Sequence, residues 1–241
     1  MLLHPVHFHP SVRHGQNQRS EALDFTGVGL LVVYLGDTCN FDCVYCDRDY
    51  IKHDIGPQNL LKKDDDEIID FIRLASEQAE DLKSLSFHGG EPFLYVDRID
   101  KLLEKIDPII GDKVTYFITT NGSLIPENEW FFEKWGKKIT ITLSYDFNYQ
   151  EVNREPINLE GIADIIAKYN SHMMFQFVIP SNLPNCFGED TIAEVLRSCK
   201  RARCDSLNLI PLRHHRGKRK FKVLIDDIEL KRWSVDFMRF V

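Results

Sequence analysis

The chain has 241 residues, of which 43% are hydrophobic and 28% are charged, and its formal net charge at pH 7 is -7. This composition is that of a globular protein and excludes a disordered or fibrous chain. The negative charge excludes a global attraction to nucleic acids or anionic membranes. The longest apolar run, residues 28–35, is far shorter than the roughly 20 residues of a membrane helix. We therefore expect neither a membrane nor a nucleic acid partner.

The first 24 residues precede the first predicted strand and are interpreted as an N-terminal arm, with residues 25–241 as a single core domain. The arm contains four histidines, but no pair of them has the i, i+4 spacing of a helical metal site, so we assign the arm no chemistry. Its start lacks a basic leader, an apolar stretch and a cleavage site, which favours a cytoplasmic protein with reduced cysteines.

Six apolar runs have the pattern of strands, and segments with helical spacing follow them. The strands are predicted at 30–35, 83–87, 114–118, 138–143, 173–179 and 206–211. The helices are predicted at 64–78, 97–107, 127–135, 159–169, 189–200 and 226–240. This alternation predicts an α/β fold with a parallel sheet flanked by helices, either an open barrel or a doubly wound sheet.

Polar motifs follow the predicted strands. "CNFDCVYC" follows the first strand, "HGGEP" the second, "TTNG" the third and "SYD" the fourth, and "PSN" and "PLR" follow the last two. The carboxyl ends of parallel strands meet at one edge of a sheet, where such folds place their chemistry. We therefore expect all these motifs to lie on one rim.

Three cysteines lie close together in the first motif, at positions 39, 43 and 46. A structural zinc site normally closes with four ligands, and here a second cysteine pair is missing. Three thiolates on one loop can instead bind three irons of a [4Fe–4S] cluster, which leaves the fourth iron open to the amino and carboxylate groups of a small molecule. The other cysteines are separated by long gaps and are interpreted as small hydrophobic residues: Cys186, Cys199 and Cys204.

The CxxxCxxC spacing of Cys39, Cys43 and Cys46 resembles the signature of the radical S-adenosylmethionine (SAM) enzymes, and Tyr45 fits the aromatic residue before the third cysteine. The resemblance covers roughly residues 28–211. It implies an open (β/α)6 barrel of the partial TIM type as the radical SAM core. It also implies a [4Fe–4S] cluster on the three cysteines, SAM as cofactor, and a reductant such as flavodoxin or ferredoxin.

The resemblance also implies cofactor-binding residues after the second and third strands. Gly89, Gly90 and Glu91 in "FHGGEP" look like the family's glycine-rich motif, which is assigned to the methionine amino group. The glycines allow close backbone approach, and the carboxylate offers an acceptor for an ammonium group. Asn121 in "ITTNGSLI" matches the peptide- and sulfatase-maturating branch of the family.

The segment "SYDFNYQEVNR" resembles the Ser-x-Asp segment of the same branch. The likeness implies Ser144 and Arg154 near the cofactor carboxylate or ribose, with Asp146 at the rim. Phe147 stands where that branch commonly has glycine, and the gap to the arginine is shorter. Gln176 on the fifth strand is either a ribose ligand or an inward-facing structural amide.

The family resemblance implies reductive cleavage of SAM to a 5′-deoxyadenosyl radical, which abstracts hydrogen from a substrate. The "GGEP", "TTNG" and "SYD" motifs favour a peptide or protein side chain as substrate. The compact barrel and Asp47, directly after the third cysteine, suggest as alternative a small-molecule enzyme similar to 7-carboxy-7-deazaguanine synthase. An iron–sulfur electron-transfer protein or a structural metal protein is disfavoured, because three cysteines leave one iron exposed.

Two features leave the substrate open. The maturating branch usually continues into a cysteine-rich extension with auxiliary clusters, and this sequence stops after the predicted sixth helix. The basic stretch "RHHRGKRKFK", residues 213–222, is either a solvated loop or a binding surface for an anionic substrate or partner. No residue is assigned as a catalytic acid or base.

Overall fold

The computed structural model describes residues 25–46, 64–110, 113–179, 189–204 and 206–211. Several predictions fall outside these residues and stay predictions. They concern the N-terminal arm, Asp47, Cys186, the basic stretch 213–222 and the helix predicted at 226–240.

The six predicted strands form one sheet in which neighbours along the chain are also neighbours in space. The strands are β1 (Leu30–Tyr34), β2 (Ser84–His88), β3 (Thr115–Thr120), β4 (Ile139–Ser144), β5 (His172–Ile179) and β6 (Leu207–Pro211). All five neighbouring pairs are parallel. Because β1 and β6 lie at opposite ends of this order, the sheet is an open (β/α) barrel, and the predicted fold is confirmed.

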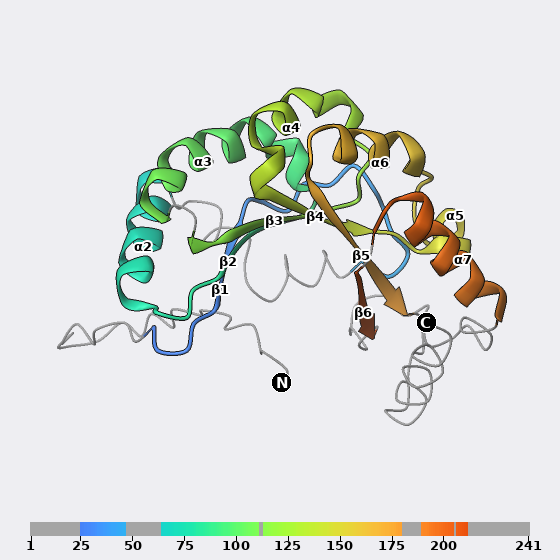
Figure 1. Ribbon diagram of the computed structural model, residues 1–241, viewed down its shortest axis with the longest axis horizontal. Coiled ribbons are helices and arrows are strands. Elements are labelled where there is room, and N and C mark those ends of the chain that lie inside the picture. Colours follow the sequence, from blue (N-terminus) through green and yellow to red (C-terminus); the bar gives the residue numbers. More distant parts are fainter. Residues whose placement is uncertain (1–24, 47–63, 111–112, 180–188, 205, 212–241) are drawn as a thin grey trace.

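Helices cover the convex side of the curved sheet (Figure 1). The five predicted helices within the described residues are confirmed: α2 (Asp65–Gln78), α3 (Val96–Ile110), α4 (Glu129–Trp135), α6 (Leu159–Lys168) and α7 (Glu189–Arg201). The structure adds one short helix and four 3₁₀ turns: α5 (Gln150–Asn153), η1 (Pro92–Tyr95), η3 (Pro126–Asn128), η4 (Gly136–Lys138) and η5 (Phe147–Tyr149). None of the described helices combines the length and apolar character that a membrane span requires.

The two faces of the sheet differ in chemistry because successive side chains of a strand point to opposite faces. The outer face packs beneath the helices and belongs to the buried core, with Leu31, Val33, Leu85, Phe87, Ile118, Ile141, Leu143, Phe175 and Phe177. The alternate positions form the inner, concave face, where hydroxyl, amide and imidazole groups come together: Tyr34, His88, Thr119, Thr142, Ser144, Gln176 and Asn208. The core thus lies outside the half-barrel, and the inner face combines these polar groups with apolar side chains such as Leu30, Val32, Phe117 and Met174.

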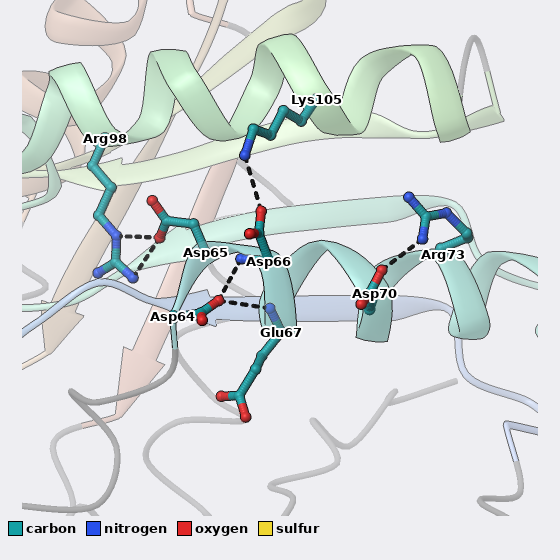
Figure 2. Close-up of polar contacts among 8 residues, drawn as sticks. All are labelled: Asp64, Asp65, Asp66, Glu67, Asp70, Arg73, Arg98 and Lys105. Atoms are coloured by element: carbon teal, nitrogen blue, oxygen red, sulfur yellow. Dashed lines mark hydrogen bonds and ion pairs between the residues drawn. The ribbon is translucent and has the colours of Figure 1, made fainter.

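Helix α2 begins at an acidic cap. Asp64 Oδ1 accepts hydrogen bonds from the backbone N–H groups of Asp66, at 2.7 Å, and Glu67, at 3.0 Å (Figure 2). A carboxylate in this position satisfies N–H groups of the first turn and interacts favourably with the positive end of the helix dipole. The run of acids in the sequence therefore fixes where the helix begins.

An arginine of α3 links this helix start to the end of β1. Arg98 donates from Nε and Nη2 to Asp65 Oδ1, both at 2.8 Å, and from Nη1 to the carbonyl of Leu35 at 3.3 Å. Figure 2 shows the Arg98–Asp65 pair between the two helices, with Lys105 contacting Asp66 farther along α3. Because Leu35 immediately precedes the motif that carries the cysteines, Arg98 fixes the point from which that motif departs.

Candidate cluster and cofactor site

The three cysteines lie on one loop after β1, which we call the cysteine loop, residues 36–46. Cys43 is buried, and Cys39 and Cys46 are half-buried. The N–H of Cys46 donates to the carbonyl of Cys43 at 3.0 Å, and the Cys39 sulfur accepts from the N–H of Phe41 at 3.4 Å. Cys39 and Cys46 both lie close enough to Cys43 to raise the pKa of its thiol.

Arg154 places a positive charge beside the cysteine loop. Burial raises the pKa of the Cys43 thiol, whereas the charge of Arg154 and the hydrogen bond that it donates to Cys43 act in the opposite direction. The guanidinium also lies 5.9 Å from the centre of the Tyr45 ring. The Tyr45 hydroxyl donates to Asp146 Oδ2 at 2.7 Å, and burial raises the pKa of Tyr45, so it stays protonated. Arg154 and Tyr45 thereby connect the cysteine loop with the segment that follows β4.

The Gly-Gly-Glu loop, residues 89–91, packs directly against the cysteine loop. The N–H of Gly90 donates to the carbonyl of Gly36, and that of Glu91 to the carbonyl of Thr38, both at 2.8 Å. A Cβ on Gly90 would lie 2.3 Å from the carbonyl oxygen of Thr38, and one on Gly89 would lie 2.6 Å from that of Gly36. Close contact between the two loops therefore requires glycine at both positions, independently of any ligand that binds nearby.

Glu91 is fully buried, and its carboxylate is engaged within the chain. Oε1 accepts from the hydroxyl of Thr120 at 2.6 Å and from the N–H of Phe93 at 2.9 Å, and Oε2 accepts from the N–H of Asn121 at 2.8 Å. This carboxylate thus joins the end of β2 to the end of β3. Its contact with the cofactor's ammonium group stays a prediction.

Asn121, also buried, extends from the end of β3 to the cysteine loop. Its Nδ2 donates to Asn40 Oδ1 at 2.9 Å and lies 3.9 Å from the Cys39 sulfur. Its Oδ1 accepts from the N–H and the hydroxyl of Ser123 at 2.9 and 2.8 Å. The predicted cofactor ligand therefore holds the first cysteine in place.

Ser144 and Gln176 are paired in register on β4 and β5, so their side chains share the inner face. The N–H of Tyr145 donates to the carbonyl of Gln176 at 3.0 Å, which ties the start of the next loop to β5. We call this loop the β4 loop, residues 145–154. Both interpretations of Gln176, ribose ligand and structural amide, are compatible with its half-buried side chain.

The β4 loop buries polar atoms for which the described part of the chain provides no partner. Among the described residues, Asp146 Oδ1, Asn153 Nδ2 and Arg154 Nε have no hydrogen-bond partner. Asn153 lies beside Asp146, but the two side chains do not meet with hydrogen-bond geometry at Oδ1. Burial raises the pKa of Asp146, whereas Arg154 and Tyr45 lower it. Buried polar atoms of this kind are costly unless a ligand or water completes their hydrogen bonds.

The structure explains how phenylalanine can stand at position 147, where the maturating branch commonly has glycine. Its backbone has φ of 51°, a left-handed conformation that glycine adopts at little cost. The ring is buried and packs edge-on against Phe175 and Phe177, with centroids 5.3 Å apart in both cases, and against Tyr145 at 5.2 Å. Core packing therefore offsets the backbone strain at this position.

The donor set fits a [4Fe–4S] cluster with bound SAM. Among the described residues, no group of His, Cys, Asp or Glu is arranged to hold a single metal ion. A cluster does not require such convergence, because each cysteine binds a different iron. Cys39, Cys43 and Cys46 would hold the cluster, and the unsatisfied atoms of Asp146 and Arg154 would face the cofactor on the same rim.

Sequence reasoning missed several residues that build the site. Thr120 and Gln150 are examples: Thr120 donates to Glu91, and Gln150 Oε1 accepts from the N–H of Asp146 at 2.9 Å. Thr120 lies within the quoted "TTNG" motif at a strand end, which is a usable signal. The sequence around Gln150 gives no such signal, because the role of Gln150 depends on the turn that brings it back to Asp146 within the β4 loop.

The chain is similar in sequence to radical SAM proteins. The model of the Radical SAM superfamily matches residues 33–226. A probable GTP 3',8-cyclase from Halobacterium salinarum is 37% identical over 98 residues, which cover 39% of this chain and 25% of that protein. The radical SAM cyclopropyl synthase TigE from Paramaledivibacter caminithermalis is 24% identical over 205 residues, which cover 76% of this chain and 42% of TigE.

Its fold is also that of a solved radical SAM protein. SuiB from Streptococcus suis, bound to S-adenosylmethionine, superimposes with a TM-score of 0.69 at 22% identity, over 88% of this chain and 47% of SuiB. The chain thus spans less than half the length of these similar proteins. The family match extends over well more than half of the chain and includes the cysteine loop. This chain therefore belongs to the Radical SAM superfamily, whose members use a [4Fe–4S] cluster and S-adenosylmethionine.

Proposed function

We propose that this chain is the core of an enzyme that abstracts a hydrogen atom from a peptide or protein side chain. When bound, the reduced cluster supplies the electron that cleaves SAM to methionine and a 5′-deoxyadenosyl radical. The chain's own residues orient the reactants. The three cysteines fix the cluster beside the rim, and Ser144, Asp146, Arg154 and Gln176 surround the proposed cofactor position. The electron donor, a flavodoxin or ferredoxin, stays a prediction.

The observation that carries the proposed substrate class is the chemistry of the inner face. Ser144, Gln176 and Asn208 lie side by side on β4, β5 and β6 by register. On the neighbouring row, the Thr119 hydroxyl lies 3.4 Å from His88 Nε2. Neutral hydroxyl and amide groups both donate and accept hydrogen bonds, as the amides of a peptide backbone do. The polar part of the inner face therefore favours an uncharged hydrogen-bonding chain as the occupant, and the apolar side chains beside it, such as Val32 and Met174, suit the side chains of a peptide.

A structural neighbour gives independent support. SuiB has also been solved bound to its precursor peptide SuiA, and in that structure it superimposes with a TM-score of 0.68 at 22% identity. At this identity the likeness concerns the fold alone. It supports the proposal in one respect, since a half-barrel of this shape is part of a protein that binds a peptide.

A nucleotide or related small molecule is the second candidate. The specific observation is the local identity of 37% to a probable GTP 3',8-cyclase, which is higher than that to TigE. The small-molecule alternative from the sequence, an enzyme similar to 7-carboxy-7-deazaguanine synthase, falls in the same class. A nucleotide would place phosphates near the rim and would require cationic side chains there.

Cofactor cleavage measured with different substrates tests the proposal. The anaerobically reconstituted and reduced chain is incubated with SAM alone, with deuterated GTP, or with a peptide fraction from the native host grown in deuterated medium. We expect the peptide fraction to increase 5′-deoxyadenosine formation and to transfer deuterium into it. Deuterium transfer from deuterated GTP alone would favour the second candidate. Absence of 5′-deoxyadenosine under every condition, with the cluster loaded and reduced, would contradict both. The Cys43→Ala variant, which lacks one of the proposed cluster ligands, is the negative control.

A further inference from the structure

Two cysteines outside the cluster motif meet at the end of α7. The helix ends at Arg201, and Arg203 adopts a left-handed φ of 52°. The N–H of Cys204 then donates to the carbonyl of Cys199 at 2.8 Å. This is the backbone geometry of a Schellman ending, in which the residues at these two positions come into side-chain contact. Cys204 belongs to the hydrophobic core and Cys199 packs against it, in agreement with the interpretation of both as small hydrophobic residues.

The two thiols are placed for a covalent bond. Cys204 is 5% exposed and belongs to the hydrophobic core, against which the half-buried Cys199 packs, and the Cys204 thiol donates to the carbonyl of Ser206 at 3.1 Å. Only a hydrogen bond of 2.8 Å and short covalent links separate the two Cα atoms, so they lie within roughly 7 Å of each other. A disulfide requires Cα atoms about 4.4–6.8 Å apart with Cβ atoms facing each other. The turn therefore meets the main geometric requirement.

We propose that Cys199 and Cys204 form a reversible dithiol–disulfide pair that locks the end of α7. The oxidant is a small disulfide such as glutathione disulfide. One thiolate attacks it, forms a mixed disulfide and releases one glutathione. The second thiol then displaces the other glutathione, so that two cysteine thiols and one glutathione disulfide give one protein disulfide and two glutathione molecules. Excess glutathione reverses the reaction.

The proposed disulfide would act on α7, a helix that packs against one of the loops of the rim. Helix α7 packs against η5, the turn within the β4 loop, and Val195 and Ser198 of this helix are buried. Glu194 and Arg201 lie near enough to Tyr145 to affect the pKa of its hydroxyl. A bond at the end of α7 therefore restricts the helix that supports the loop carrying Asp146 and Arg154.

The same environment sets the rate of the reaction. Contact with Cys204 and burial raise the pKa of Cys199, which slows attack by this thiol near neutral pH. Oxidation is therefore slow near pH 7 and accelerates as the pH rises, because the thiolate is the attacking species.

Peptide mapping tests the bond directly. The full chain is purified anaerobically, equilibrated with glutathione buffers of increasing disulfide content at pH 8, acid-quenched, alkylated and digested with trypsin. Cleavage between the two cysteines releases "SCK", residues 198–200, and "CDSLNLIPLR", residues 204–213, whereas Cys186 falls in a third peptide. We expect these two peptides to appear linked, with the loss of two hydrogens, and the linked fraction to fall again in excess glutathione.

Two variants and one further measurement complete the test. Cys199→Ser should abolish the linked pair, and Cys186→Ser should leave it unchanged. Hydrogen exchange along residues 195–201 should slow on oxidation of the wild type and stay constant in Cys199→Ser. A link of either cysteine to Cys186, a stable glutathione adduct, or full alkylation of both thiols in the most oxidising buffer would overturn the proposal. If the disulfide forms but hydrogen exchange along residues 195–201 stays the same, the proposal that the disulfide locks the end of α7 would be wrong.

Discussion

The rim of the half-barrel has two halves that are built differently. The first half, with the loops after β1, β2 and β3, joins its segments by hydrogen bonds within the chain, and the buried carboxylate of Glu91 accepts three of them. The second half, the β4 loop, buries three polar atoms for which the described residues supply no partner. A fully satisfied region is ordered before any ligand arrives, whereas an unsatisfied one gains stability when a ligand supplies the missing hydrogen bonds.

This difference separates two tasks within one site. The first half holds the cysteine loop, whose geometry must be fixed for three irons to be bound at once. The second half carries Asp146 and Arg154, whose unsatisfied atoms we propose the cofactor completes. Substitutions in the first half should therefore cost stability of the chain, and those in the second half should mainly affect cofactor binding.

The largest effect is expected at Glu91. Glu91→Ala removes the acceptor of two buried N–H groups and one hydroxyl, so the free energy of unfolding should fall by about 3–5 kcal/mol. Urea denaturation of the cluster-free chain measures it. Glu127→Ala, at an exposed site, should change stability by less than about 0.5 kcal/mol. A loss as small as that of the control would show that Glu91 does not join the two strand ends.

Gly90→Ala should also destabilise the first half of the rim. The new Cβ would overlap the carbonyl oxygens of Thr38 and Asp37, so the Gly-Gly-Glu loop must move away from the cysteine loop. We expect a loss of about 1–3 kcal/mol and reduced iron retention. Gly29→Ala is the matched control, because its Cβ would meet only the carbonyl oxygen of Asp81, at 3.5 Å. Equal iron retention in the two variants would argue against contact between the loops.

Phe147→Gly separates packing from backbone strain in the second half. Glycine removes strain of about 1–2 kcal/mol but also removes a buried ring worth about 3–5 kcal/mol. The net loss should therefore be about 2–3 kcal/mol by denaturation. Asn170→Gly has a similar φ of 53° but an exposed side chain, and it should be nearly neutral. A stabilised Phe147→Gly would mean that strain, and not packing, dominates at this position.

The smallest change in stability, and of opposite sign, is expected for Asp146→Asn. Neutralising a buried carboxylate with an unsatisfied oxygen should stabilise the cofactor-free chain by about 1 kcal/mol. The same change should weaken SAM binding about tenfold if Oδ1 contacts the cofactor. Thermal denaturation and equilibrium dialysis measure the two quantities, with Asp164→Asn on the exposed face of α6 as control. Unchanged SAM affinity would remove Asp146 from the cofactor site.

The sequence was sufficient for elements whose pattern is local. Each strand is an apolar run bounded by polar residues, and α2 begins at the acids of positions 64–66, so the order of elements and the rim could be predicted. The partners of Glu91 could not, because Phe93, Thr120 and Asn121 come from segments up to 30 residues away. Likewise, the meeting of Cys199 and Cys204 depends on a left-handed turn at Arg203, which local composition does not reveal.

The most direct test of the account is iron analysis and electron paramagnetic resonance of the anaerobically reconstituted, reduced chain, with and without SAM. We expect about four irons per chain in the wild type. The signal of the reduced cluster should change when SAM is added, because SAM binds the open iron. Both the irons and the signal should be lost in Cys43→Ala and kept in Cys199→Ala. Stoichiometric zinc without iron, or a cluster that survives Cys43→Ala, would contradict the assignment of the three cysteines.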